Sequence, residues 1–482
     1  MDSEDYNLIL VSNAEPYAHR RKGEEIEQEK LAGGLTSALD PLMQKIDGVW
    51  IAWGRENADF EVLNSEGKVR VPDENGYELK RLKLTEKEVD GFYLGFSNEI
   101  LWPICHSFPE RSSLSNYRSC EKKWEIYSDV NRKYADMVLE ELEGNDLIWI
   151  HDYHLSLVPR MIRKENTEAN ISTFWHIPWP PWEIFGSLPW REEIIEGLVA
   201  SDFLGFHTPT IKENFFSCAR NIGMNIIEEK SLVNRKGSET RVASIPLGID
   251  YNWFNSLSNK DKYNKKAEKL RKRIPGQKII VGIDRLDYTK GIPERLRAFE
   301  LFLEENPEFQ GEVTLVQRIP PSRSSVKEYQ SILNQINRLV GEINGKFEKA
   351  DWTPIKSFHR FLSKQEQLIP YYMIADVGLV TPLIDGMNLV SKEFIACTDD
   401  GVLVLSEFAG AAEELKEAIQ VNPYNVRETA QGIKKALTMT PRERKERITQ
   451  LKKRVKENDL GKWREKFIKN WLRDSPKRNF SL

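Results

Sequence analysis

The 482-residue sequence has few cysteines, no long apolar run and little net charge. Its four cysteines stand far apart without any C-x-x-C pair, which argues against a disulfide framework and against a zinc site. No apolar run approaches the length that crosses a membrane, and the acidic N-terminal residues are unlike a signal peptide. We therefore expect a cytoplasmic protein without a membrane partner.

The charge is also too balanced to point to a polyanionic partner. The formal net charge is -4, although 30% of the residues are charged. Such a balance is ordinary for a globular protein and gives no reason to expect binding to nucleic acid. We expect small-molecule ligands, and the oligomeric state, including a homo-oligomer, is left open.

The length and the apolar pattern predict the fold class. A chain of 482 residues is about twice what one hydrophobic core organises, so we expect two domains. Short, uniformly apolar runs such as "DLIWIHD", "KIIVGIDRL" and "DVGLVTP" alternate with helix-length polar or amphipathic stretches. Such runs are typical of strands buried on both faces of a parallel sheet, which predicts an α/β fold.

A polar, lysine-rich stretch, "NSLSNKDKYNKKAEKLRKR", indicates the domain boundary. It predicts an N-terminal domain of residues 1–255 and a C-terminal domain of residues 256–482. The final segment, "RERKERITQLKKRVKENDLGKWREKFIKNWL", has helical spacing and mixed charge, which indicates a solvated helix docked through its Trp and Leu residues. We leave open that this helix packs back on the N-terminal domain.

Polar side chains follow many of the predicted strands. They are His151, Asp152, His154, His176, Asp284, Arg285, Asp287, Arg318, Arg323, Asp385 and Glu407. In open parallel sheets, ligands bind beyond the carboxyl ends of the strands. Because both halves of the chain contribute such residues, we expect an interdomain active-site cleft.

The segment "DRLDYTKGIPERL" combines two cations with a predicted helix start. Lys290 and Gly291 stand just before a helix whose early Pro293 fits the first turn, and Arg285 follows the preceding strand. Two cations beside free helix N–H groups would bind a phosphate or a diphosphate. The alternative is that both cations form ion pairs with nearby acids, which are Asp284, Asp287 and Glu294.

The segment "VGLVTPLIDGMNLVSKEF" predicts a strand, a loop and a helix that begins near Asn388. The N–H groups at the start of such a helix are available to an anion, and here they belong to Met387, Asn388, Leu389 and Val390. Asp385 and Glu393 could accept hydrogen bonds from sugar hydroxyls, which favours a nucleotide sugar. Alternatively, Asp385 only turns the chain and Glu393 is a surface helix residue.

A glycine pair in "KLAGGLTSAL" is a weaker signal. Gly33 and Gly34 precede a predicted helix and would let the backbone approach a phosphate, but such a pair is often only a turn.

Taken in order, "LAGGL", "FSNEILWP", "IWIHDYHL", "HIPWP", "DRLDYTKGIPERL", "INGKFEKADWTPI" and "TPLIDGMNLVSKEF" resemble the trehalose-6-phosphate synthases over residues 7–470. The resemblance implies two Rossmann-like domains in the GT-B arrangement. It also implies a retaining glucosyltransferase that moves glucose from a nucleoside diphosphate glucose, here most simply UDP-glucose, to glucose 6-phosphate. No metal or other cofactor is expected, and the sequence has no spacing typical of metal ligands.

The resemblance also implies roles for individual residues. Catalytic roles fall to Arg285, Lys290, Asp152 and His176. Donor binding falls to Gly34, Arg285, Lys290, Asp385, Met387, Asn388, Leu389, Val390 and Glu393. Acceptor binding falls to Tyr93, Trp102, Asp152, Arg323 and Trp53.

One position departs from the family. The first strand of these enzymes typically ends in Ser-Asn-Arg, where the arginine binds phosphate, whereas this sequence has Ala14. A methyl group cannot replace a guanidinium. The neighbouring "HRR", His19 to Arg21, could compensate. The alternatives are a transferase with another acceptor, such as glycerol 3-phosphate in glucosylglycerol-phosphate synthases, and a non-catalytic nucleotide-sugar-binding paralogue.

Overall fold

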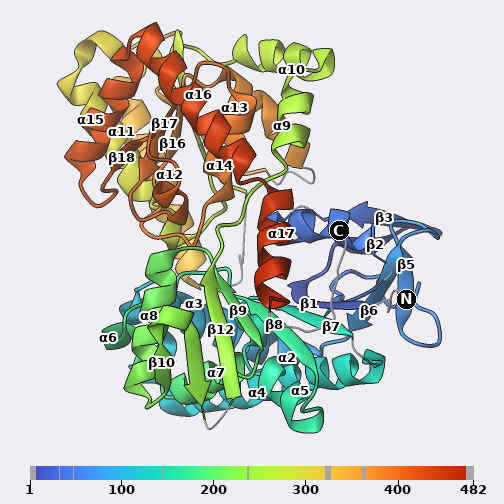
Figure 1. The fold of residues 1–482 in the computed structure, drawn as a ribbon. Coiled ribbons are helices and arrows are strands. Elements are labelled where there is room, and N and C mark those ends of the chain that lie inside the picture. Colours follow the sequence, from blue (N-terminus) through green and yellow to red (C-terminus); the bar gives the residue numbers. More distant parts are fainter. Residues whose placement is uncertain are drawn as a thin grey trace. The chain divides into compact units, whose positions relative to one another are not determined.

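The computed structural model describes residues 7–31, 33–46, 48–144, 146–235, 238–320, 327–360 and 365–473. The chain divides into two compact units (Figure 1), one formed by Met1–Ile245 with Arg464–Leu482 and the other by Pro246–Trp463. The boundary expected near residue 255 falls inside helix α9 (Tyr251–Ser258), because the chain leaves the first sheet after β12 (Ser238–Ser244). Both units combine sheets with helices, which confirms the predicted α/β class.

The first unit contains a mixed sheet. Its strand order is β10-β11-β12-β9-β8-β7-β1-β4-β6-β5, and the central strands are all parallel. The strands are β1 (Leu8–Ala14), β4 (Val49–Trp53), β5 (Lys68–Val71), β6 (Tyr77–Leu82), β7 (Leu147–His151), β8 (Asn170–Phe174), β9 (Phe203–Phe206), β10 (Asn225–Ile227), β11 (Leu232–Arg235) and β12. Strands β7, β8 and β9 are buried almost throughout, as expected for apolar runs covered on both faces.

A separate hairpin follows β1. Strands β2 (Tyr17–Lys22) and β3 (Glu25–Lys30) pair antiparallel, with Arg20 opposite Glu27. Most of its residues beyond Ala18 are partly or fully exposed, and ion pairs such as Arg20 to Glu29 cross it. This hairpin was not predicted, because its sequence lacks an apolar run.

The helices of the first unit are α1 (Gly34–Met43), α2 (Glu86–Glu88), α3 (Trp102–Cys105), α4 (Tyr117–Glu141), α5 (Val158–Glu165), α6 (Trp182–Phe185), α7 (Arg191–Leu198) and α8 (Pro209–Asn221). A π-helical segment, η1 (Val89–Leu101), packs against α4. Helix α4 also contacts β1, β4 and α5, which places it over the middle of the sheet.

The last helix, α17 (Leu460–Trp471), joins the first unit from Arg464 onward. The Phe467 ring stacks on Trp149 of β7 with 4.4 Å between centroids, and it also contacts Phe174 of β8 and Phe203 of β9. The Trp471 Nε1 donates to Asn170 Oδ1 at 2.6 Å. Figure 1 shows α17 in red beside these strands.

The second unit is built on a fully parallel sheet with the order β15-β14-β13-β16-β17-β18. The strands are β13 (Lys278–Ile283), β14 (Val313–Arg318), β15 (Ile355–Phe358), β16 (Val377–Val380), β17 (Val402–Ser406) and β18 (Ile419–Val421). The order reverses between β13 and β16, so the loops after these two strands diverge and leave room for a ligand.

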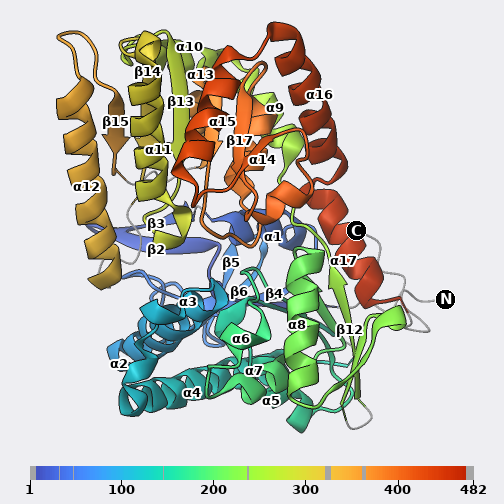
Figure 2. The same ribbon diagram turned by 90° about the vertical axis from the view of Figure 1, so that its left-hand side faces the viewer.

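Two groups of helices cover this sheet (Figure 2). One group packs together as α11 (Ile292–Glu305), α12 (Lys327–Phe347) and α15 (Val426–Thr438), and the other as α9, α10 (Asp261–Arg271), α13 (Ile369–Ile374), α14 (Leu389–Cys397) and α16 (Pro441–Glu457). A doubly wound, Rossmann-like unit results. Across the described part of the chain, no helix combines the length and apolar character needed to span a membrane.

Candidate active site

In the second unit, the predicted diphosphate site lies at the carboxyl end of β13. Lys290 ends a 3₁₀ turn, and Gly291 then caps α11 with φ at 62°. A side chain at Gly291 would place Cβ 2.5 Å from the Thr381 carbonyl oxygen, so only glycine fits this tight entry. Arg285 is exposed beside this turn, and its Nη2 lies 3.6 Å from Asp287 Oδ2.

Lys290 is paired with a residue from the other predicted loop. Its Nζ lies 2.6 Å from Asp385 Oδ2, and both side chains are largely buried. The structure therefore brings these two predicted donor-site residues together although 95 positions separate them. The predicted alternative, in which both cations pair with neighbouring acids, holds for Arg285 and Asp287 but not for Lys290.

Helix α14 begins where the sequence predicted, with Asn388 as its N-cap. Asn388 has φ 77° and ψ 86°, and its Oδ1 accepts from the Ser391 N–H at 3.1 Å. Among the described residues, the N–H groups of Asn388, Leu389 and Val390 meet no acceptor, while that of Met387 has a long 3.4 Å contact with Asp385. The helix start is thus open to an anion.

Glu393 is buried inside the second unit. It is 4% exposed, and its two carboxylate oxygens accept from the Tyr372 hydroxyl and from Gln365 Nε2, each at 2.6 Å. Burial raises the pKa of Glu393, opposed by these two hydrogen bonds. The alternative of a surface helix residue is therefore wrong, and Glu393 is a carboxylate in a fixed orientation.

A buried arginine that the sequence analysis missed supports this loop cluster. Arg295 donates to Asp284 Oδ2 at 2.6 Å, to Thr381 Oγ1 at 3.0 Å and to the Lys290 carbonyl at 3.4 Å. It thereby connects the loops after β13 and β16. Its position on the apolar face of the helix in "GIPERLRAF" could have indicated a buried ion pair, because a charged residue on a buried helix face needs a partner.

In the first unit, Asp152 follows β7 in a rare backbone conformation. Its φ is 74° and its ψ is 168°, which is unfavourable for a residue with a side chain. Its Oδ1 accepts from the N–H groups of Tyr153 at 3.0 Å and His176 at 3.3 Å. These bonds fix the carboxylate at the end of the strand.

His176, at the end of the neighbouring strand, belongs to a histidine cluster. Its Nε2 lies 3.0 Å from His151 Nδ1, and its ring is 5.3 Å from that of His207. Burial, followed by the two neighbouring histidines, lowers the pKa of His176 well below 6.5, and burial lowers that of His151 to about 3. Both rings therefore stay neutral at physiological pH and act as hydrogen-bonding groups.

Two of the predicted acceptor residues lie against each other. Trp53 ends β4, and its ring is 5.4 Å from that of Tyr93 in η1, in an edge-on arrangement. Trp102 starts α3, where its buried ring contacts His106 and Tyr153. Gly34 is the first residue of α1, so the glycine pair opens a helix, as predicted. Arg323 lies outside the described residues.

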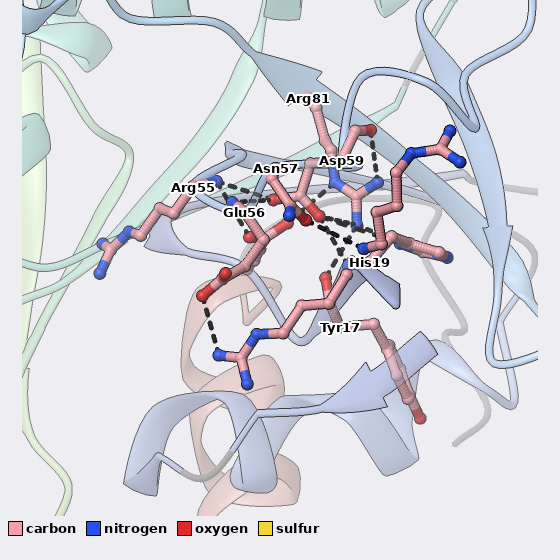
Figure 3. A network of polar contacts seen from close by, with 10 residues as sticks. Tyr17, His19, Arg55, Glu56, Asn57, Asp59 and Arg81 are labelled. Atoms are coloured by element: carbon pink, nitrogen blue, oxygen red, sulfur yellow. Dashed lines mark hydrogen bonds and ion pairs between the residues drawn. The ribbon is translucent and has the colours of Figure 1, made fainter. Parts of the chain in front are cut away.

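A buried ion network lies beside Ala14, the last residue of β1 (Figure 3). Arg81 Nε donates to Glu15 Oε2 at 2.8 Å, and its Nη2 lies 3.4 Å from Asp59 Oδ1, with all three side chains fully buried. The Arg81 Nη2 also meets His19 Nδ1 at 2.8 Å. Since one guanidinium faces two carboxylates, the cluster has an excess acid.

The "HRR" segment next to Ala14 is already engaged. His19 belongs to the network, Arg20 pairs with Glu29 at 2.7 Å and with Glu56 at 2.8 Å, and Arg21 pairs with Glu61. These contacts use the charges that could have compensated for Ala14. The structure therefore gives no support to compensation by this segment.

The network makes stability depend on pH. Burial raises the pKa of Glu15 to about 8, opposed by Arg81 and aided by Asp59. The folded protein thus binds the proton of the Glu15 carboxyl group more tightly than the unfolded chain does. The contribution of this proton to the stability of the fold is complete below pH 4.5 and is lost as the pH rises through 8. We expect Glu15→Gln to flatten the decline of the thermal midpoint between pH 5 and 8, relative to an exposed Glu61→Gln control. An unchanged slope would contradict the assignment.

Comparisons with known proteins identify the family of this chain. A model of the family described as Glycosyltransferase family 20 matches residues 6–473. The sequence is 37% identical over 481 residues to an alpha,alpha-trehalose-phosphate synthase (UDP-forming) of Candida albicans, covering 98% of each. It is 40% identical over 475 residues to a bifunctional trehalose-6-phosphate synthase/phosphatase of Thermoproteus tenax, covering 96% of this chain but only 63% of that relative.

The fold has a solved counterpart. The crystal structure of an alpha,alpha-trehalose-phosphate synthase (UDP-forming) from Burkholderia xenovorans in complex with glucose-6-phosphate superposes with a TM-score of 0.85 at 31% identity. The match covers 97% of this chain and all of that one. The predicted two Rossmann-like units are confirmed, whereas the roles of individual residues stay predictions.

Proposed function

The chain belongs to glycosyltransferase family 20, and we propose that it transfers glucose from UDP-glucose to glucose 6-phosphate, giving trehalose 6-phosphate and UDP. The observation that carries the proposal is the loop cluster of the second unit. There, Arg285, Lys290 and the open start of α14 offer cations and N–H groups, and Asp385 and Glu393 offer carboxylates. A nucleotide sugar needs both kinds of group.

The donor chemistry follows from the charges. Cleavage of the bond between the sugar carbon and the phosphate oxygen leaves negative charge on the diphosphate. Arg285 and Lys290 would stabilise that charge more as it grows than in the bound substrate, which lowers the barrier. Lys290 must then exchange its contact with Asp385 for one with the diphosphate, which frees the Asp385 carboxylate for glucose hydroxyls.

The acceptor hydroxyl then forms the new bond. In a retaining reaction on one face of the sugar, the departing diphosphate oxygen takes the proton of the acceptor hydroxyl as that hydroxyl oxygen bonds to the sugar carbon. We assign Asp152 and His176 to sugar hydroxyls, since both are fixed and His176 is neutral. Tyr93, Trp102, Trp53 and Arg323 remain the proposed acceptor contacts, and the scheme uses no metal.

The test is release of the nucleoside diphosphate from UDP-, ADP- and GDP-glucose, each with glucose 6-phosphate or glycerol 3-phosphate, in a buffer containing EDTA. We expect turnover with UDP-glucose and glucose 6-phosphate, and an NMR spectrum of an α,α-linked product. Turnover only with glycerol 3-phosphate would identify the related transferase. Donor binding without turnover for any pair would identify a non-catalytic paralogue.

Glu393 yields a prediction about the ribose. Replacing Glu393 by Gln removes the charged acceptor and should weaken UDP binding about 10- to 100-fold, in line with about 1.5–3 kcal/mol for a hydrogen bond to a charged group. The measurement is the Kd of UDP and of 2′,3′-dideoxy-UDP by calorimetry. The protein should prefer UDP, and the variant should lose that preference.

A purely structural role for Glu393 would give another pattern. Loss of its bonds to Tyr372 and Gln365 would then weaken both nucleotides equally and lower the thermal midpoint. Equal weakening would contradict the ribose assignment.

A further inference from the structure

We propose that Arg55 binds the phosphate group of the acceptor, an assignment that rests on the proposed function and names a residue outside the predicted set. Arg55 follows β4 by two residues. Its guanidinium carbon lies 4.3 Å from the centroid of the Trp53 ring and 5.1 Å from that of Tyr93. It therefore rests on the two aromatic rings that the resemblance places at the acceptor.

The main chain at Arg55 is fixed by the ion network. Its N–H donates to Asp59 Oδ2 at 2.8 Å and has a longer contact of 3.3 Å with Glu15 Oε1. The network of Arg81 with these two carboxylates thus positions Arg55. Figure 3 shows the Arg55 side chain pointing away from the network rather than into it.

The guanidinium is held without being neutralised. Its Nη2 donates to the Asn13 carbonyl at 3.2 Å, and among the described residues no carboxylate forms an ion pair with it. By contrast, Arg20, Arg21 and Arg81 each have carboxylate partners. An oriented guanidinium whose remaining N–H groups are available suits a phosphate, which it can bind through two parallel hydrogen bonds.

Arg55 lies where it can supply the positive charge that the family has at position 14 and that Ala14 lacks. Ala14 pairs directly with Trp53 across β1 and β4, and the carbonyl that anchors Arg55 belongs to the preceding residue, Asn13. The guanidinium therefore lies beside the end of β1, where this sequence has only a methyl group. A cation supplied by the end of β4 takes the place of one supplied by the end of β1.

A cavity adjoins this arginine. It has a volume of about 400 Å³ and is lined by Trp53, Arg55 and Lys83 together with Glu56, Glu86 and Asp90. A site of this size can admit a sugar phosphate. The mixture of cations and carboxylates fits a ligand that carries both an anionic group and hydroxyl groups, since the carboxylates can accept hydrogen bonds from the hydroxyls.

The experiment compares the unmodified protein with Arg55→Ala and Arg55→Lys, and with Arg21→Ala as a matched control that removes an ion-paired arginine of the same unit. For each protein we measure kcat and the KM of glucose 6-phosphate, the Kd of glucose 6-phosphate and of inorganic phosphate, and the Kd of UDP. We expect Arg55→Ala to raise the acceptor KM about 10- to 100-fold, with kcat and the UDP Kd nearly unchanged. Arg55→Lys should recover part of the loss, and Arg21→Ala should behave as the unmodified protein.

A rescue variant separates phosphate binding from folding. Adding Ala14→Arg to Arg55→Ala should restore much of the affinity for glucose 6-phosphate, because it returns a cation to the same place. An acceptor KM within twofold of the unmodified protein in Arg55→Ala would overturn the inference while leaving the proposed function intact. If only glycerol 3-phosphate supports turnover, the proposed acceptor is wrong and the same comparison is made with that ester. Absence of binding of any phosphate ester to the unmodified protein would overturn the inference as well.

Discussion

Replacing Lys290 by Met is expected to lower kcat by about 100- to 1,000-fold, the usual loss when one preorganised group that stabilises developing charge is removed. Lys290 is a largely buried cation just before α11, whereas Arg285 is exposed. In the proposed mechanism its charge faces the diphosphate only once the contact with Asp385 is exchanged, so the loss should be larger in kcat than in the affinity for UDP-glucose. Initial rates of UDP release and calorimetric titration of the donor measure the two effects.

The matched control is Lys278→Met. Lys278 begins β13 and pairs with Asp376 at 2.9 Å, so this variant also removes a lysine from an ion pair, but at the opposite end of the strand from the donor loops. It should retain the kcat of the unmodified protein. A Lys290→Met variant with kcat within threefold of that value would show that this lysine is structural.

The largest effect on stability is expected for Arg81→Met. This change leaves Glu15 and Asp59 buried without their guanidinium, and breaking a buried ion pair in this way costs about 3–5 kcal/mol. Urea unfolding, with amide exchange read separately in β1, β4 and β6, measures the loss in the first unit. The exchange of the second unit should change little.

Two further variants sharpen this result. Adding Glu15→Gln to Arg81→Met replaces the buried acid that lost its partner by a neutral amide, and it should recover part of the stability at high pH, where that acid would otherwise ionise. Arg21→Met removes a partly exposed arginine from an ion pair of the hairpin and should leave the unfolding midpoint unchanged. Equal destabilisation by Arg81→Met and Arg21→Met would show that the network contributes no more than a surface pair.

The parallel strands could be predicted because their sequence pattern is uniformly apolar. Runs such as "DLIWIHD" and "KIIVGIDRL" became β7 and β13, which lie in the interiors of their sheets. The hairpin β2–β3 was missed for the same physical reason. Its strands are held partly by ion pairs of exposed side chains, such as that between Lys22 and Glu27, and these leave no periodic apolar signal.

In the candidate site, too, the features set by neighbouring residues could be predicted, whereas the contacts between distant parts of the chain could not. Local signals placed the N-cap of α14 and the glycine before α11, because caps and glycines depend on a few neighbouring residues. The contact of Lys290 with Asp385 depends on which two strands lie side by side, which a single sequence does not reveal. Arg55 was missed because a single arginine in a loop belongs to no sequence motif. It becomes a candidate ligand-binding residue only when the structure shows its contacts with the rings of Trp53 and Tyr93.

The assignment of residues 464–482 to the first unit has a consequence for how the protein is made. Synthesis on the ribosome completes the second unit before it delivers Phe467 and Trp471, the side chains that cover Trp149 and reach Asn170. Domains generally fold as they emerge, the N-terminal one first. Here the unit that starts first must wait for the last helix, so its apolar face stays exposed throughout the synthesis of its neighbour.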